Sequence, residues 1–356
     1  PGLKSKLRIR RRRMGSATVL FAFFPCVILL FLRGAKNACG IIRGIYLKAG
    51  IKRFAFSLYK VFPFVIHHYD IIHFEYGHNG LQYQDLLELK EIIKSKFIQS
   101  FHGADLYFLT LRHGQGVYKN IFEKMDHFHF VSRGLLNYSR SLGYSKDNYK
   151  VIPSSADTDF FKPSAKTKNN DSVIIASVGR FHWQKGYEYS LQALKILREK
   201  GYKFRFNVVG DGSYKEAILQ AIQDFGLSEH VCLLGARNRF EVRKLLDNSD
   251  IFIQASIEEG FGNSFLEAGA MELPCVVTAA GGGPEAIIDN ETGFIVAKRD
   301  PEAMAERIER LINNPGLRRE MGQYSRRHIC SHYSLKKQIE DNVSMYKSCL
   351  GNAVFI

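Results

Sequence analysis

The sequence predicts an α/β protein made of two doubly wound domains. After Asp70, short apolar runs alternate with helical stretches, which is typical of βα units in a mostly parallel sheet. The chain has 356 residues, of which 46% are hydrophobic, enough to fill two cores. A polar segment at residues 162–171 interrupts the alternation. We therefore expect an N-terminal domain over residues 1–163, a second domain over 164–335, and a C-terminal helix within 336–356.

In the first half, we expect strands at residues 70–76, 97–103, 127–132 and 149–155. No strand followed by a glycine-rich loop precedes them, and the chain begins at Pro1 rather than Met. We interpret the N-terminal domain as incomplete at its start and the chain as a fragment of a longer protein.

The second half shows a cleaner alternation of strands and helices. We expect strands at residues 172–180, 204–212, 231–237, 250–256, 274–282 and 292–297, and helices at about 186–200, 213–224, 240–248, 264–271 and 301–312. Ligands of such a domain bind at the carboxyl ends of the strands, where helix N-termini present free amides. Each loop that follows a strand is therefore a candidate site.

The net charge of +15 is concentrated at the front of the chain. Residues 1–69 contain fourteen Lys and Arg and no Asp or Glu, whereas the rest has 36 basic and 35 acidic residues. The basic run leads into sixteen apolar residues, Ala17 to Leu32, which is short of the roughly 20 that span a bilayer. We expect residues 1–60 to contact anionic lipid at a membrane surface. A buried helix with solvated basic neighbours is the alternative, and nucleic acid ranks lower because the interleaved residues are aliphatic and Phe.

The cysteines indicate neither a zinc cluster nor a disulfide scaffold. They are scattered and never form a C-x-x-C pair: Cys26, Cys39, Cys232, Cys275, Cys330 and Cys349. A reducing, cytoplasmic setting is the simplest interpretation.

The segment GRFHWQKG follows a predicted strand and begins a predicted helix, with Arg180 and Lys185 five residues apart. An Arg guanidinium binds two oxygens at once and a Lys adds a point charge, so the two cations suit a pyrophosphate. Taken alone, the segment also fits a loop with exposed basic residues.

The segment IEEGFGNSFLEAG combines two carboxylates with a helix start. Ser264 or Asn263 is the expected N-cap, which would place Glu267 in the first helical turn and Glu259 in the preceding loop. Glycines in the loop allow a ligand to approach the backbone. One carboxylate could accept sugar or ribose hydroxyls while the helix amides face phosphate, which favours a nucleotide-sugar. Two solvated glutamates in an ordinary loop are the alternative.

Three further features are weaker. His102 follows a strand and precedes Gly103, a position that opens toward a cleft, although a lone His is more often structural. Glu285 follows a glycine turn at the start of an expected helix. Asp157 and Asp159 form a D-x-D pair, which in other sugar transferases binds a metal, but we expect no metal here.

Together these segments resemble the retaining glycosyltransferases of family 4, which have the GT-B fold, two Rossmann-like domains facing a cleft. The resemblance runs from about residue 65 to the C-terminus, through SFHGADLY, VIPSSADTDFF, GRFHWQKG, VVGDGSYKEAI, EEGFGNSFLEA, AAGGGPEAI and ETGFIVA. The SFHGAD form is most similar to enzymes of bacterial capsule, exopolysaccharide and lipopolysaccharide biosynthesis.

The resemblance implies roles for the candidate residues. Four would bind the donor diphosphate: Arg180, Lys185, Gly262 and Asn263. Glu267 would contact the donor ribose, and Phe261 would lie beside the sugar. Glu259 and His102 would be catalytic, facing the reacting sugar. Glu285 would be structural or would support a residue that contacts the ligand. The C-terminal helix would return to the N-terminal domain.

The activity implied is transfer, with retention, of a sugar from a UDP- or GDP-sugar to a lipid-linked or polysaccharide acceptor in cell-surface glycan biosynthesis. No metal or other cofactor is expected. The enzyme would be cytoplasmic, at the inner face of the membrane, without a nucleic-acid partner. The alternative is a non-catalytic protein that binds nucleotide-sugars or polysaccharides. A nicotinamide-dependent oxidoreductase ranks far behind, because GDG at residues 210–212 lacks the third glycine of that fingerprint.

Overall fold

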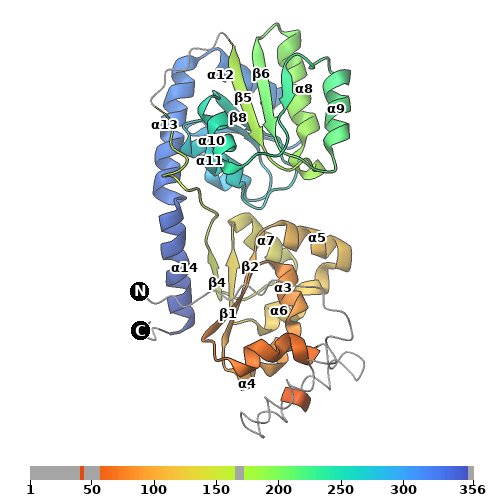
Figure 1. Cartoon of the computed structure of the whole chain (residues 1–356), viewed down its shortest axis with the longest axis vertical. Helices are drawn as coiled ribbons and strands as arrows, with labels where there is room; N and C mark the ends of the chain where they lie inside the picture. The colour runs from red at the N-terminus through yellow and green to blue at the C-terminus, as the bar shows by residue number, and fades with distance from the viewer. Residues whose placement is uncertain (1–40, 44–56, 165–171, 352–356) are drawn as a thin grey trace. The chain divides into compact units, whose positions relative to one another are not determined.

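The computed structural model describes residues 41–43, 57–164 and 172–351 (Figure 1). Most of the basic segment 1–60 and of the expected linker 162–171 therefore lies outside the described residues. No helix in the described ranges is long and apolar enough to cross a membrane. The chain divides into two compact units: residues 1–99 with 120–126, and residues 100–119 with 127–356.

The first unit is built around the pairing of two parallel strands. Strand β1 (Ile71–Phe74) pairs with β2 (Lys96–Phe101) in the register Ile71 to Lys96. The connecting segment holds α3 (Gly77–Gln82), η1 (Gln84–Leu89) and α4 (Lys90–Ile93). The rings of Phe74 and Phe97 stack at a centroid distance of 6.1 Å and are both buried, so aromatic packing fixes this pairing.

Two more strands continue the parallel sheet. Strand β3 (His127–Phe130) pairs with β4 (Tyr149–Val151), and the sheet order is β1-β2-β3-β4. The connecting helices are α5 (Ala104–His113), η2 (Gln115–Tyr118), α6 (Lys119–Lys124) and α7 (Arg133–Ser141). The four strands expected in this half of the chain are confirmed.

The second unit also contains a parallel sheet of six strands in the order β10-β9-β8-β5-β6-β7. The strands are β5 (Val173–Val178), β6 (Phe204–Val209), β7 (Val231–Leu233), β8 (Ile251–Gln254), β9 (Cys275–Thr278) and β10 (Gly293–Val296). All six lie inside the expected ranges. After β5, the next two strands along the chain, β6 and β7, lie on one side of β5, and β8 then lies on its other side. The boundary between β5 and β8 is therefore the switch point of the sheet, where ligands of doubly wound domains bind.

Helices cover the six-stranded sheet. They are α8 (Tyr187–Glu199), α9 (Lys215–Asp224), α10 (Arg239–Asp247), α11 (Asn263–Ala270) and α12 (Pro301–Ile312), and Figure 1 shows α8 and α9 beside β6. Helix α8 packs on α12, and their apolar faces form one core with β5 and β6 that includes Leu194, Phe206 and Ile308. The five expected helices are confirmed to within two residues at each end.

Two elements differ from expectation. The longest helix, α13 (Pro315–His332), follows α12 after only two residues and was not predicted. The turn at Glu285 forms η4 (Gly283–Ala286), a short 3-10 element instead of the expected helix. The expected C-terminal helix is α14 (Leu335–Cys349); its Gln338 donates to the carbonyl oxygen of Pro153 at 3.0 Å, just beyond β4.

Candidate functional site

The loop after β5 carries both predicted cations. Arg180 is exposed, and within the described ranges no carboxylate pairs with its guanidinium. Lys185 ends η3 (Trp183–Lys185), and α8 begins after Gly186. The φ of Gly186 is +57°, and a Cβ there would lie 2.1 Å from the carbonyl oxygen of Ala255. Only glycine fits, so the Lys185 backbone is held against the end of β8.

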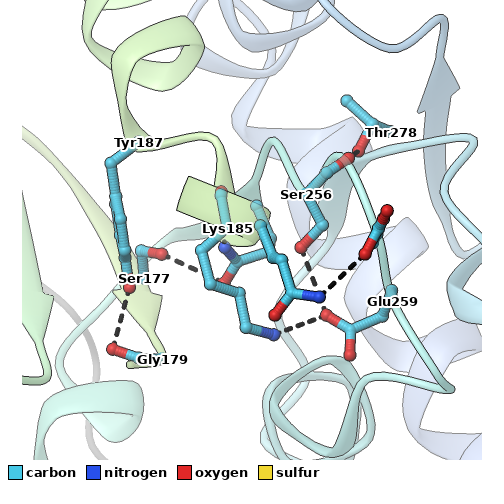
Figure 2. Close-up of polar contacts among 10 residues, drawn as sticks. Ser177, Gly179, Lys185, Tyr187, Ser256, Glu259 and Thr278 are labelled. Atoms are coloured by element: carbon cyan, nitrogen blue, oxygen red, sulfur yellow. Dashed lines mark hydrogen bonds and ion pairs between the residues drawn. The ribbon is translucent and has the colours of Figure 1, made fainter. Parts of the chain in front are cut away.

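The side chain of Lys185 crosses to the loop after β8 and pairs with Glu259 (Figure 2). The distance from Lys185 Nζ to Glu259 Oε2 is 2.5 Å, and the two side chains are only 18% and 12% exposed. Ser256 Oγ donates to the same oxygen at 3.2 Å. The structure thus brings together two residues for which the family resemblance implies separate roles, one for phosphate and one for sugar.

A buried polar network supports this pair (Figure 2). Gln254 Nε2 donates to the carbonyl oxygen of Lys185 at 3.1 Å, and Ser177 Oγ donates to Gln254 Oε1 at 3.4 Å. Thr278 Oγ1 donates to the carbonyl oxygen of Ser256 at 2.5 Å. Our sequence reasoning missed these residues, although each is a polar residue at or just past the end of an apolar strand, a signal that could have identified them.

The N-terminus of α11 differs from the prediction. The N-cap is Gly262, with φ 94° and ψ 68°, and not Asn263 or Ser264. A Cβ on Gly262 would lie 2.5 Å from the ring of Phe265, so glycine is required where the chain turns into the helix. Asn263 and Ser264 are instead the first two helical residues, whose amides have no partner within the helix. These amides face away from the helix body and suit an anion.

The ring of Phe261 lies inside the protein. It is 3% exposed and packs on Tyr333 at a centroid distance of 5.5 Å. The ring therefore packs in the interior, and the neighbouring Gly262 is buried as well. A role of this residue beside the donor sugar stays a prediction.

Glu267 lies in the second turn of α11, not in the first as predicted, because the helix begins at Asn263. Burial raises the pKa of the Glu267 carboxyl to about 7, opposed by the nearby positive charge of Arg239. Arg239 is held by an ion pair with Asp157 at 2.8 Å and lies over the ring of Phe160 at 3.8 Å. Glu267 is therefore a half-buried carboxyl that is readily protonated near neutral pH unless a ligand donates to it.

His102 follows β2 in a tight turn. Its amide and that of Gly103 donate to Asp105 Oδ1 at 3.0 and 2.8 Å. A Cβ on Gly103 would lie 2.7 Å from the Cα of Gly260, so the two glycines allow the turn after β2 to approach the loop after β8 within the second unit. The backbone of His102 is thus close to that of the Glu259 loop.

A second histidine lies beside His102. The two rings are edge to face at 5.9 Å. His129 is buried, with Nε2 2.8 Å from the carbonyl oxygen of Ile152 and Nδ1 2.7 Å from Ser100 Oγ. Because a carbonyl oxygen only accepts, Nε2 carries the proton. His129 is therefore fixed in one orientation and packs edge to face against the His102 ring.

Glu285 has a structural partner. Its carboxylate accepts the amides of Arg133 and Gly134 at 3.0 and 2.8 Å, at the N-terminus of α7. A carboxylate there satisfies helix amides and the helix dipole.

Asp157, the first residue of the D-x-D pair, is engaged with protein groups. Asp157 pairs with Arg239 and accepts the amide of Phe160 at 3.1 Å, and the hydrogen bond from Arg239 lowers the pKa of its carboxyl. In the described part of the chain, no group of three or more His, Cys, Asp or Glu is arranged to hold a metal ion. Metal independence stays a prediction.

A cavity of about 260 Å³ lies next to the Glu259 loop. Its lining includes Tyr107 of α5, Tyr138 of α7, Glu258 and Lys298. Burial raises the pKa of the Tyr107 hydroxyl to about 12, with a further contribution from Glu258. Two aromatic rings, a carboxylate and an ammonium group form a lining suited to a polar ligand with hydroxyl groups.

A family model matches the part of the chain that contains the six-stranded sheet. Residues 159–328 match the family model "Glycosyl transferases group 1". Over these residues the chain is similar to that family. The matched range contains both cations of the β5 loop and both glutamates of the loop and helix after β8.

Several curated relatives have the names of biosynthesis glycosyltransferases. The chain is 33% identical over 181 residues to the capsular polysaccharide biosynthesis glycosyltransferase CapM of Staphylococcus aureus, covering 51% of this chain and 47% of CapM. It is 26% identical over 246 residues to the putative colanic acid glycosyltransferase WcaL of Escherichia coli K12, covering 67% and 60%. It is 27% identical over 252 residues to the amylovoran glycosyltransferase AmsK of Erwinia amylovora, covering 68% and 61%. The chain thus spans about half to three fifths of these relatives.

Solved structures share the fold. A sucrose-phosphate synthase from Thermosynechococcus elongatus superposes with a TM-score of 0.75 at 21% identity, covering 84% of this chain and 78% of that one. A glycosyltransferase from Rickettsia africae gives 0.69 at 23% identity, covering 88% and 82%. The predicted GT-B fold and the resemblance to capsule and exopolysaccharide glycosyltransferases are confirmed.

Proposed function

We propose that this protein transfers a sugar from a nucleoside diphosphate sugar, UDP- or GDP-linked, to a lipid-linked or polysaccharide acceptor in the synthesis of a cell-surface glycan. One observation carries the proposal. At the switch point of a parallel sheet, the loop after β5 presents two cations, and the adjacent strand β8 leads to a glutamate and a helix N-terminus. This is the set of groups that a diphosphate joined to a sugar would need.

The phosphate-binding groups would act on the leaving group. As the glycosidic bond breaks, negative charge grows on the diphosphate, and Arg180, Lys185 and the amides of Asn263 and Ser264 would stabilise it. Removing one well-placed donor of this kind costs about a hundredfold or more in turnover. The departing phosphate would accept the proton of the acceptor hydroxyl on the same face, giving retention without a metal.

The carboxylates would bind hydroxyl groups. Glu259, in the loop before α11, would accept from the donor sugar, and Glu267, in the second turn of α11, from the ribose, as the resemblance to family 4 implies. His102, supported by His129, would face the reacting sugar. These assignments follow the resemblance to family 4.

The proposal also gives a location. Surface-glycan precursors carried on lipid are reached at a membrane, and the basic residues of the segment 1–60 suit anionic headgroups. We therefore place the reaction in the cytoplasm at the inner face of the membrane.

A donor screen tests the function. UDP- and GDP-sugars are added to the protein, with the melting temperature and the release of nucleoside diphosphate as readouts. We expect one donor to raise the melting temperature, and Arg180→Ala to abolish that shift. Arg205→Ala is the matched control, because Arg205 is also exposed but lies near the start of β6, at the amino-terminal ends of the strands. Equal shifts in the wild type and Arg180→Ala would contradict the proposal. Protection without turnover would instead favour the non-catalytic alternative.

A further inference from the structure

The Lys185–Glu259 ion pair sets a condition on ligand binding. It joins one of the two cations that the proposed function assigns to phosphate to the carboxylate that it assigns to the donor sugar, at 2.5 Å. Both groups are largely removed from water, so neither can lose its partner without a replacement.

The backbones on both sides of the pair are fixed. The Lys185 carbonyl is held by Gln254, and Gly186 has no room for a side chain. The carbonyl oxygen of Glu259 accepts the amide of Gly282 at 3.2 Å, and a Cβ on Gly281 would lie 1.9 Å from that oxygen. Only the side chains can rearrange, and the four-carbon stem of Lys185 is the flexible part.

The two carboxylate oxygens of Glu259 differ in their hydrogen-bond partners. Oε2 receives both Lys185 and Ser256, whereas no donor reaches Oε1 within the ranges that the structure describes. If Lys185 turns to a diphosphate, Glu259 keeps only the Ser256 hydroxyl and stands as a mostly buried negative charge beside an anion. That arrangement is unfavourable unless new hydroxyl donors reach the carboxylate.

We infer that Lys185 exchanges partners, leaving Glu259 for the diphosphate, and that the hydroxyls of the donor sugar replace it on Glu259. This inference rests on the proposed function. A complete nucleotide-sugar supplies the diphosphate for Lys185 and the hydroxyls for Glu259, but a nucleoside diphosphate supplies only the phosphate. Glu259 therefore weakens the binding of the product relative to the donor and favours product release after transfer.

The test is calorimetric titration of the full chain with the nucleoside diphosphate and with its sugar conjugate, without acceptor. Glu259→Gln should bind the nucleoside diphosphate about fivefold to tenfold more tightly than the wild type, because nothing competes for Lys185. The ratio of donor affinity to product affinity should fall by at least as much. The matched control is Glu309→Gln: Glu309 of α12 pairs with Lys200 at 2.7 Å and belongs to none of the loops of the site, so this variant should bind like the wild type.

A double-mutant cycle separates exchange from simple repulsion. In a Lys185→Met background, Glu259→Gln should change the affinity for the nucleoside diphosphate by less than about twofold. An equal gain with and without Lys185 would show only removal of a repelling charge and would overturn the inference. An unchanged or weaker affinity in Glu259→Gln would overturn it as well.

Ser256→Ala is an independent variant for which the affinity for the nucleoside diphosphate should change in the opposite direction. Without the serine donor, Glu259 depends more on Lys185, so the nucleoside diphosphate should bind more weakly than to the wild type. Tighter binding would contradict the exchange. If neither UDP nor GDP bound the wild type, the proposed function itself would fall; turnover with unchanged affinity ratios would overturn only the exchange.

Discussion

The protonation of Glu267 gives a prediction that separates stability from ligand binding. Burial raises the pKa of this carboxyl from 4.5 to about 7. The folded state therefore holds a proton that the unfolded chain has lost. The associated stability is fully present below pH 4.5 and is lost as the pH rises to about 7. At 1.36 kcal/mol for each pH unit of difference, the free energy of unfolding should fall by about 3 kcal/mol over this window.

The substitution Glu267→Gln keeps the shape of the side chain and removes the titration. At pH 4.5 the variant and the wild type should be almost equally stable, and above pH 7 the variant should be the more stable by up to about 3 kcal/mol. Urea unfolding of both proteins at a series of pH values measures this difference, in which all other titrating groups cancel. Parallel stability curves for the two proteins between pH 5 and 8 would refute the reasoning.

The same carboxyl should link donor binding to pH. In the proposed function, ribose hydroxyls donate to the ionised carboxylate, so binding should lower the pKa of Glu267 and release protons. Calorimetry of nucleotide binding near pH 6.5, in two buffers of different ionisation enthalpy, should reveal proton release by the wild type. The release should be absent in Glu267→Gln, and equal release by both proteins would assign the protons to another group.

Three further predictions follow from other parts of the structure. Gly186→Ala should lower the free energy of unfolding by about 3 kcal/mol, because the added Cβ meets the Ala255 carbonyl. Gly201 also has a positive φ but lies in open space, so Gly201→Ala should lower it by only about 1 kcal/mol. Comparable losses in the two variants would contradict the clash. Because Asp157 is engaged by Arg239, chelation with EDTA should leave sugar transfer within about twofold of its original rate, and activity restored only by added Mg²⁺ would contradict this. The protein should sediment with anionic but not with neutral liposomes, and identical behaviour on both would argue against an electrostatic contact through residues 1–60.

The strands could be predicted because their signal is local. Runs such as VIIASV over Val173–Val178 are apolar on both faces, short, and followed by glycine, so their type and place follow from a few residues. Helix α13 could not be predicted in the same way. Its 18 residues are mostly polar, and the residues it buries include Gly322 and Ser325. Ser325 packs against Gly269 of α11, so the helix depends on a tertiary contact that its own sequence pattern does not show.

The start of α11 shows a competition between two local rules. Asn and Ser are strong N-caps, which favoured Asn263 or Ser264. The ring of Phe265 instead fills the space that a Cβ at position 262 would need, and Gly262 turns the chain in a left-handed conformation one residue earlier. A shift of one or two residues is enough to move Glu267 from the first turn to the second, away from the helix amides.

The pairing of Lys185 with Glu259 lies beyond what spacing can show. The two residues are 74 positions apart, and they meet because β8 returns to the side of β5 opposite to β6. A doubly wound sheet makes this adjacency of loops expected, but not the choice of partner for each side chain. Because the cation and the carboxylate neutralise each other before any ligand arrives, the roles suggested for them one at a time by the sequence cannot be independent. A ligand that satisfies only one of the two leaves the other uncompensated, so the proposed selectivity for a phosphate joined to a sugar would follow from the pair rather than from either residue.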